Sequence, residues 1–221
     1  MKLILSGGWL QERGIFETNV KKVHFLNSLK DLKDVKLGFI VLSYHLSSQT
    51  LNLHLKDSSY PKVILLELEG FSPFNRKRKD TSLKLLASSL DEKAYVERVK
   101  KVKEFISEGV VYQLNLTCRF DFRLDGEPLD LFLSYYKTQP VPYAFFLDLE
   151  DFYLISGSME LFLEKRGNKL VSKPIKGTAK RKKDLEKSQK DKAENLMITD
   201  MVRNDLSRVA MPGSVKVEEL F

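Results

Sequence analysis

The sequence predicts an α+β fold, in which mostly antiparallel sheets carry helices packed outside. Three observations lead to this prediction. Residues 111–124 alternate apolar and polar side chains at the period of a β-strand. Four more strand-like segments lie between residues 143 and 175, separated by short turns. The two helical patterns lie before and after this run of strands, which argues against a doubly wound parallel sheet.

Residues 1–82 are predicted to form an N-terminal, mainly β region. Segments 37–46 and 62–71 are apolar and bounded by polar turns, and segment 51–56 alternates at period two, so each is predicted as a strand. Residues 72–82 are rich in charged residues and contain Pro and Asn, which makes them the best candidate for an internal boundary.

The second region, residues 83–221, begins with a predicted helix. Asp91 can cap it, Gly109 can end it, and its apolar stripe comprises Tyr95, Val99, Val102 and Ile106. The strand at 111–124 follows, and then strands at 143–149, 152–158, 159–165 and 169–175. A long helix is predicted from Asp184 to Leu206, and its buried side comprises Leu185, Leu196, Met197, Met201 and Val202. Residues 215–220 are predicted as a final short strand.

Composition limits the classes of function. The 221 residues are 43% hydrophobic and 30% charged, which fits one or two ordinary domains with a real core. The single cysteine, Cys118, excludes an internal disulfide and is typical of a cytoplasmic protein. The apolar run at the N-terminus is too short for a signal, and no run approaches the ~20 residues of a membrane span. We therefore expect a cytoplasmic protein without a membrane partner.

The net charge of +7 raises the question of an anionic partner. The densest basic stretch, residues 165–192, also contains acidic residues and has no interleaved aromatic residues that could stack on bases. It therefore predicts a solvated basic face, and no nucleic-acid partner is expected.

Three groups of residues could carry chemistry. Glu160 lies beside an apolar strand and could act as a general acid, although this residue taken alone favours an ordinary strand-end glutamate. Lys176 could be a nucleophile, a fixed cation for a carboxylate, or simple surface charge, and Gly177 and Thr178 beside it could contact a ligand. The familiar phosphate-loop, dinucleotide and hydrolase motifs are absent from the sequence.

The third group is on the last predicted helix. Asp191 and Glu194 are three residues apart, so both carboxylates project from one helix face. Two carboxylates on one face suit Mg²⁺, which accepts one or two protein carboxylates together with water and substrate oxygens. A charged helix face with local ion pairs is the alternative.

Taken together, these segments resemble the chorismate-utilising enzyme family, which includes the anthranilate, aminodeoxychorismate, isochorismate and salicylate synthases. The matching segments appear in the family's order and are EGVVYQLNLTCRF (108–120), ISGSMELFLEK (155–165), KPIKGTAKR (173–181), AENLMITDMVRNDLSRVA (193–210) and PGSVKVEELF (212–221). The lysine of PIKGT is typical of the branch that aminates chorismate at C4, whereas the branch that aminates it at C2 usually has alanine there. PVPYAF (140–145) resembles an effector-binding stretch of the C2 branch and keeps that alternative open.

The resemblance implies roles for the candidate residues. Lys176 would attack C2 of chorismate, and Glu160 would be the acid and base. Glu194 would be a Mg²⁺ ligand, assisted by Asp191. A glutamine amidotransferase subunit would deliver ammonia, and the product would lead to p-aminobenzoate and folate.

The resemblance is incomplete. Met159 replaces the family's usual proline, and Ala179 with Lys180 replaces a common Arg-Pro-Arg run. Several later segments of the family's catalytic domain have no counterpart, so residues 83–221 are expected to be its N-terminal half. The chain is then expected either to act as a synthase or to be inactive until a complementary C-terminal polypeptide binds.

Overall fold

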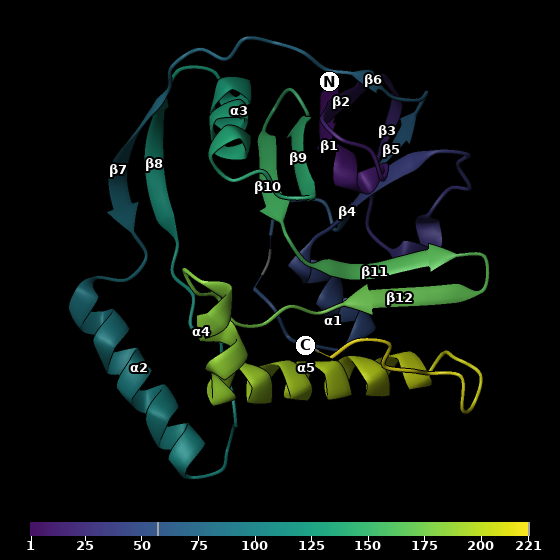
Figure 1. Cartoon of the computed structure of the whole chain (residues 1–221). Helices are drawn as coiled ribbons and strands as arrows, with labels where there is room; N and C mark the ends of the chain where they lie inside the picture. Colours follow the sequence, from purple (N-terminus) through teal and green to yellow (C-terminus); the bar gives the residue numbers. More distant parts are fainter. Residues whose placement is uncertain (57, 221) are drawn as a thin grey trace. The chain divides into compact units, whose positions relative to one another are not determined.

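The structure is a computed structural model that describes residues 1–56 and 58–220, apart from the side chain of Lys182 (Figure 1). The described residues form a mixture of helices and antiparallel sheets, which confirms the predicted α+β class. The chain forms two compact units, one of residues 1–74 with 141–221 and one of residues 75–140. The division predicted at residue 82 stays a prediction.

The first unit contains a five-stranded antiparallel sheet in the order β10-β9-β1-β2-β6. Its strands are β1 Lys2–Ser6, β2 Ile15–Thr18, β6 Ser72–Pro73, β9 Tyr143–Asp148 and β10 Tyr153–Ser158. The N-terminal apolar run therefore forms the central strand, which pairs β2 on one side and β9 on the other. The strands predicted at 143–149 and 152–158 are both present.

A second sheet of the same unit has the order β3-β5-β4, with bounds Val20–Leu26, Val63–Leu68 and Gly38–Leu42. The strand β5 is paired along both of its edges, and all of its residues except Glu67 are buried. The main apolar core unites this sheet with the five-stranded one and consists of Leu3, Leu5, Ile64, Leu66, Leu68, Leu147 and Leu149.

The strand predicted at 51–56 is wrong. This segment follows the short helix α1, Ser47–Thr50. The same unit also contains three 3₁₀ turns, which are Gly7–Trp9, Leu29–Asp31 and Tyr44–Leu46. Asn52 has φ +54, a left-handed conformation that interrupts a strand, and no residue of 51–56 is assigned to a sheet.

The rest of the first unit carries the candidate site. Strands β11, Leu161–Arg166, and β12, Lys169–Lys173, form a separate hairpin, as predicted, with the turn at Gly167. The predicted long helix is interrupted: α4 spans Lys182–Lys187 and α5 spans Gln189–Ser207, because Ser188 takes an extended ψ of 104° and caps α5. Residues 215–220 form no strand.

None of the five residues on the predicted buried side of this helix is buried, and Leu185 and Val202 are half-buried. Leu196, Met197 and Met201 are exposed, and no residue of α5 is buried. Among the described residues, no helix is both long and apolar enough to cross a membrane.

The second unit contains β7 Ser82–Ser88, α2 Glu92–Ser107, β8 Phe120–Asp125 and α3 Pro128–Thr138. Asp91 caps α2, since its carboxylate accepts a hydrogen bond from the backbone N of Ala94 at 2.7 Å. The strand predicted over 111–124 is correct only for its last five residues, 120–124. The ladder between β7 and β8 ends where Ser88 meets Phe120, so residues 111–119 have no partner strand in it.

Candidate active site

The antiparallel register of the β11–β12 hairpin brings Glu160 and Lys176 to the same end of it. Leu161 pairs with Lys173, so the residues just before β11 and just after β12 leave the hairpin at its open end. Glu160 lies in the bend between β10 and β11 and is half-buried. Ser158 fixes that bend, because its hydroxyl accepts from the backbone N of Glu160 and donates to its carbonyl oxygen, both at 3.1 Å.

Lys176 is also half-buried. Its ammonium donates a hydrogen bond to the carbonyl oxygen of Ile175 at 3.0 Å, so the side chain folds back over its own backbone. This conformation leaves hydrogen-bonding capacity on an ammonium that has three donors.

Gly177 connects this segment to α5. It has φ +83, and a Cβ atom at this position would lie 2.9 Å from both Cβ and Cγ of Asp191. Position 177 therefore requires glycine for two reasons, its backbone conformation and the close approach of Asp191. Thr178 is exposed.

Asp191 lies in the first turn of α5, where Ser188 caps the helix by accepting from the backbone N of Asp191 at 3.2 Å. The helix N-terminus favours a negative charge there. Glu194 is one turn further on, and its carboxylate pairs with Lys190 at 3.7 Å.

A cavity of about 670 Å³ lies between β12, α5 and residues 215–220. Lys176 and Asp191 both line it, whereas Glu160, Thr178 and Glu194 are not among its lining residues. The C-terminal segment is held in place by two polar contacts: the side-chain amide of Asn195 donates to the Leu220 carbonyl at 2.5 Å, and Lys169 pairs with Glu218 at 3.2 Å.

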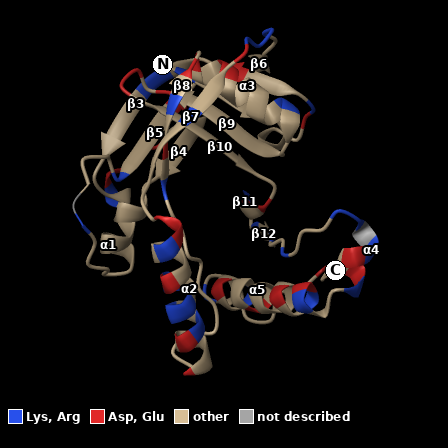
Figure 2. Ribbon diagram, turned by 90° about the vertical axis from the view of Figure 1, so that its left-hand side faces the viewer, with Lys and Arg blue, Asp and Glu red and all other residues tan. Residues whose placement is uncertain are grey.

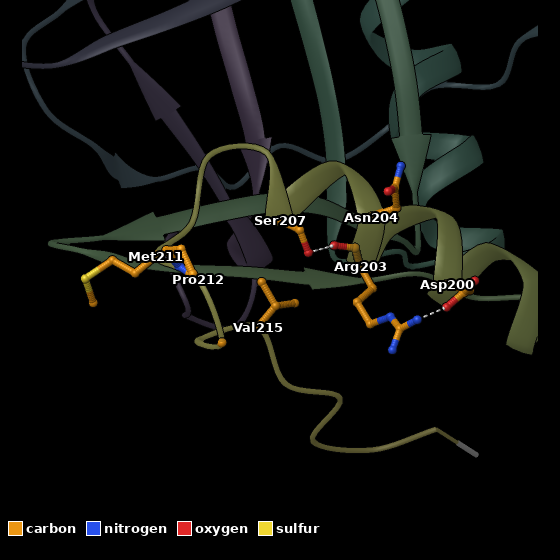
Figure 3. Close-up of a pocket in the computed structure, with 8 residues that line it drawn as sticks. Asp200, Arg203, Asn204, Ser207, Met211, Pro212 and Val215 are labelled. Carbon is orange, nitrogen blue, oxygen red and sulfur yellow. Dashed lines mark hydrogen bonds and ion pairs between the residues drawn. The ribbon is translucent and has the colours of Figure 1, made fainter.

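A smaller cavity of about 400 Å³ lies at the C-terminal end of α5 (Figure 3). Arg203 and Asn204, which lie in the family-like segment 193–210, line it. The Arg203 guanidinium points to Asp200 and pairs with it at 2.5 Å, and the Ser207 hydroxyl donates to the Arg203 carbonyl at 2.8 Å (Figure 3). Both of these contacts of Arg203 are therefore within α5.

Within the described residues, no group of three or more His, Cys, Asp or Glu side chains could hold a metal. Asp191 and Glu194 supply two hard oxygen donors from one helix face, which is the number that Mg²⁺ takes when substrate and water complete its shell. The residues therefore fit Mg²⁺ bound together with a substrate.

Sequence reasoning missed two groups that shape the site. The hydroxyls of Ser158 and Ser188 fix the bends that place Glu160 and Asp191. A serine two or three residues before a charged residue is a known turn and cap signal, so both could have been found. Asn195 was missed too, and its partner Leu220 is too distant in sequence to be inferred.

Charged residues are mixed along the helices. Figure 2 shows basic and acidic segments following one another on both α2 and α5. On α5 this reflects local pairs such as Lys190–Glu194 and Arg203–Asp200. These helices do not form one basic surface.

The structure thus places an acid and a lysine at the open end of an antiparallel hairpin, and two further carboxylates on the helix α5. The chain matches the family described as chorismate binding enzyme over residues 23–221, and it belongs to that family.

Individual relatives belong to two kinds of synthase. The chain is 33% identical over 177 residues to aminodeoxychorismate synthase component 1 of Bacillus subtilis, covering 76% of the chain and 37% of that protein. It is 38% identical over 167 residues to the protein of that name in Escherichia coli, covering 71% and 36%. It is also 37% identical over 143 residues to anthranilate synthase component 1 of Saccharolobus solfataricus, covering 60% and 34%. The chain thus spans about a third of the length of these relatives.

Proposed function

We propose that the chain is the part of an aminodeoxychorismate synthase component 1 that carries its nucleophile, and that it takes part in converting chorismate and ammonia to 4-amino-4-deoxychorismate. The observation that carries this proposal is the position of Lys176. It follows β12 in the PIKGT segment, at the hairpin end where Glu160 also lies, and it lines the cavity shared with Asp191. Two relatives named as this synthase support it.

The proposed chemistry is a double displacement. The Lys176 amine forms a bond to C2 of chorismate while the hydroxyl at C4 leaves, and Glu160 protonates that hydroxyl so that water departs. Ammonia then forms a bond to C4 and the amine of Lys176 is expelled from C2. The overall change is chorismate plus ammonia to 4-amino-4-deoxychorismate plus water.

The remaining candidate residues would bind the substrate. Backbone N–H groups near Gly177 can approach a ligand closely because no side chain intervenes, and the Thr178 hydroxyl can donate to a carboxylate. Asp191 and Glu194 would hold Mg²⁺. When bound, this ion neutralises the charge of a substrate carboxylate that the acidic residues of the site would otherwise repel.

We propose two protein partners. A glutamine amidotransferase subunit would supply ammonia, consistent with the name component 1 of the relatives. The part of the relatives that lies beyond the matched third would pack against this chain, whether or not the same polypeptide carries it. Exposed apolar surface supports the second partner: β7 is exposed along its whole length, and neither α2 nor α5 buries a residue.

Anthranilate synthesis is the second candidate function. The relative from Saccharolobus solfataricus favours it, and so does PVPYAF. In this structure that stretch begins β9, and the Pro142 carbonyl accepts a hydrogen bond from Ser6 at 2.6 Å. The lysine at position 176 is the observation that ranks this candidate second.

The product decides between the candidates. The chain is co-expressed with a polypeptide corresponding to the part of the Bacillus subtilis relative that follows its matched residues. The purified complex receives chorismate, Mg²⁺ and ammonium chloride, and then an aminodeoxychorismate lyase. We expect p-aminobenzoate, and none without the lyase. Anthranilate would establish the second candidate, and a stable complex that forms neither product would refute both.

A further inference from the structure

Asp130 is a fully buried carboxylate that the proposed chemistry does not use. It lies in the first turn of α3, where the helix N-terminus favours its negative charge. One of its oxygens accepts from Nη2 of Arg76 at 2.9 Å, and the other accepts from the backbone N of Lys79 at 3.0 Å. Both donors belong to residues 75–81, NRKRKDT, which we call the basic strap.

The basic strap lies alongside α3. The Arg78 guanidinium donates to the Ser134 hydroxyl at 3.1 Å, one helical turn beyond Asp130. The backbone of Lys79 contacts Asp130 and the side chain of Arg78 contacts Ser134 further along α3, so the strap runs antiparallel to this helix and the Arg76 side chain reaches back to Asp130.

The far end of the basic strap is held by packing. Gly126, in the connection from β8 to α3, has φ +113, and a Cβ there would lie 2.8 Å from Cγ2 of Thr81 and 3.3 Å from the carbonyl oxygen of Asp80. The β7–β8 ladder begins at the next residue, where Ser82 pairs with Asp125. The strap thus has consecutive contacts from Arg76 to the start of β7.

We propose that Asp130 anchors the basic strap along α3. This anchoring contact, which we call the latch, protects the four consecutive basic residues of the strap from cleavage by trypsin-like proteases. One carboxylate receives both a side-chain and a backbone hydrogen bond, so its loss releases the strap at two points at once. Loss of these hydrogen bonds would leave a buried carboxylate without partners, which costs free energy of folding. Among the described residues, Arg76 and the backbone N of Lys79 have no other buried carboxylate as an acceptor.

The rate of trypsin cleavage within the basic strap measures how often the strap is released from α3, because trypsin cleaves after Arg and Lys and requires a locally released chain. Limited trypsin digestion of the full chain, followed by mass spectrometry, gives the rate of cleavage after residues 76–79. Lys33 and Lys36, in an exposed loop of the other unit, give an internal reference rate. In the native protein we expect the strap to be cleaved at least about tenfold more slowly than this loop.

The test variant is Asp130→Asn, and the control is Glu97→Gln, which changes an exposed acid on α2. We expect Asp130→Asn to speed cleavage of the strap by about tenfold or more relative to the reference loop, and Glu97→Gln to leave it unchanged. Arg76→Gln, which keeps the carboxylate and the sites after residues 77–79, should speed cleavage less. Strap cleavage as fast as that of the loop in the native protein, or unchanged in Asp130→Asn, overturns the latch. Equal acceleration within α2 would show that Asp130 supports the whole unit and would also overturn it.

Discussion

Gly177 and Asp191 are in direct contact, and this contact joins the segment after β12 to the first turn of α5. A Cβ at position 177 would lie 2.9 Å from Cβ and Cγ of Asp191 and 3.1 Å from its Oδ1. Two residues fourteen positions apart, each singled out in the sequence for a different reason, therefore belong to one structural unit. Lys176 is adjacent to it and lines the same cavity as Asp191.

Gly177→Ala should destabilise the protein through both backbone strain and this contact. We expect a loss of about 1–3 kcal/mol in the free energy of unfolding, measured by urea denaturation. Gly213→Ala is a matched control, since Gly213 has a similar φ of +77 but no heavy atom within 4 Å of its Cβ position. The control measures strain alone. Equal losses in the two variants would mean that the contact with Asp191 contributes nothing.

The sequence predicted well those strands whose partners are close in the chain. Strands β9 to β12 follow one another, and their turns contain Glu150 with φ +70 and Gly167 with φ +55. The pattern at 111–124 is as regular, yet only its last five residues, 120–124, are in a strand. Its length is set by β7, which ends at Ser88, and alternation within one segment does not contain that information.

The candidate site was predictable in its residues and not in its geometry. Lys176, Glu160 and Asp191 came from local sequence and from resemblance to a family. Their arrangement depends on the register of β11 with β12 and on the contact of Gly177 with Asp191, which are long-range properties. The helix α3 was missed, although Pro128 at its first turn is a start signal.

Ser6→Ala should weaken the central sheet. Ser6 is buried, and its hydroxyl accepts from the backbone N of Ala144 at 2.7 Å while donating to the Pro142 carbonyl at 2.6 Å. Loss of the hydroxyl leaves a buried N–H without this partner, at a cost of about 1–3 kcal/mol in unfolding free energy. Thermal and urea unfolding measure it. Ser156→Ala, at an exposed position of β10, should change the free energy by less than about 0.5 kcal/mol.

Leu66→Ala and Leu83→Ala should differ strongly although both positions are strand leucines. Leu66 is fully buried in the main core, whereas Leu83 of β7 is 47% exposed. We expect Leu66→Ala to cost about 2–5 kcal/mol and Leu83→Ala about 1 kcal/mol or less when the chain is studied alone. If the proposed second polypeptide covers β7, Leu83→Ala should also weaken its binding, measured by calorimetry, by severalfold.

Lys176 should be essential to the proposed reaction through its nucleophilicity and not only its charge. In the complemented enzyme, Lys176→Ala should lower p-aminobenzoate formation at least about 100-fold. Unfolding should be little changed, because the hydrogen bond from Lys176 is to the adjacent carbonyl of Ile175. Lys180→Ala, at an exposed position of the same segment, is the control and should keep the native rate.

Lys176→Arg separates the two roles that a lysine could have here. Arginine keeps a positive charge for a substrate carboxylate, but its guanidinium stays protonated and is a poor nucleophile. We therefore expect Lys176→Arg to be as inactive as Lys176→Ala while its KM for chorismate, from residual turnover, stays nearer the native value. An arginine variant with near-native rate would assign Lys176 the role of a fixed cation, and an unchanged rate in Lys176→Ala would remove it from the reaction.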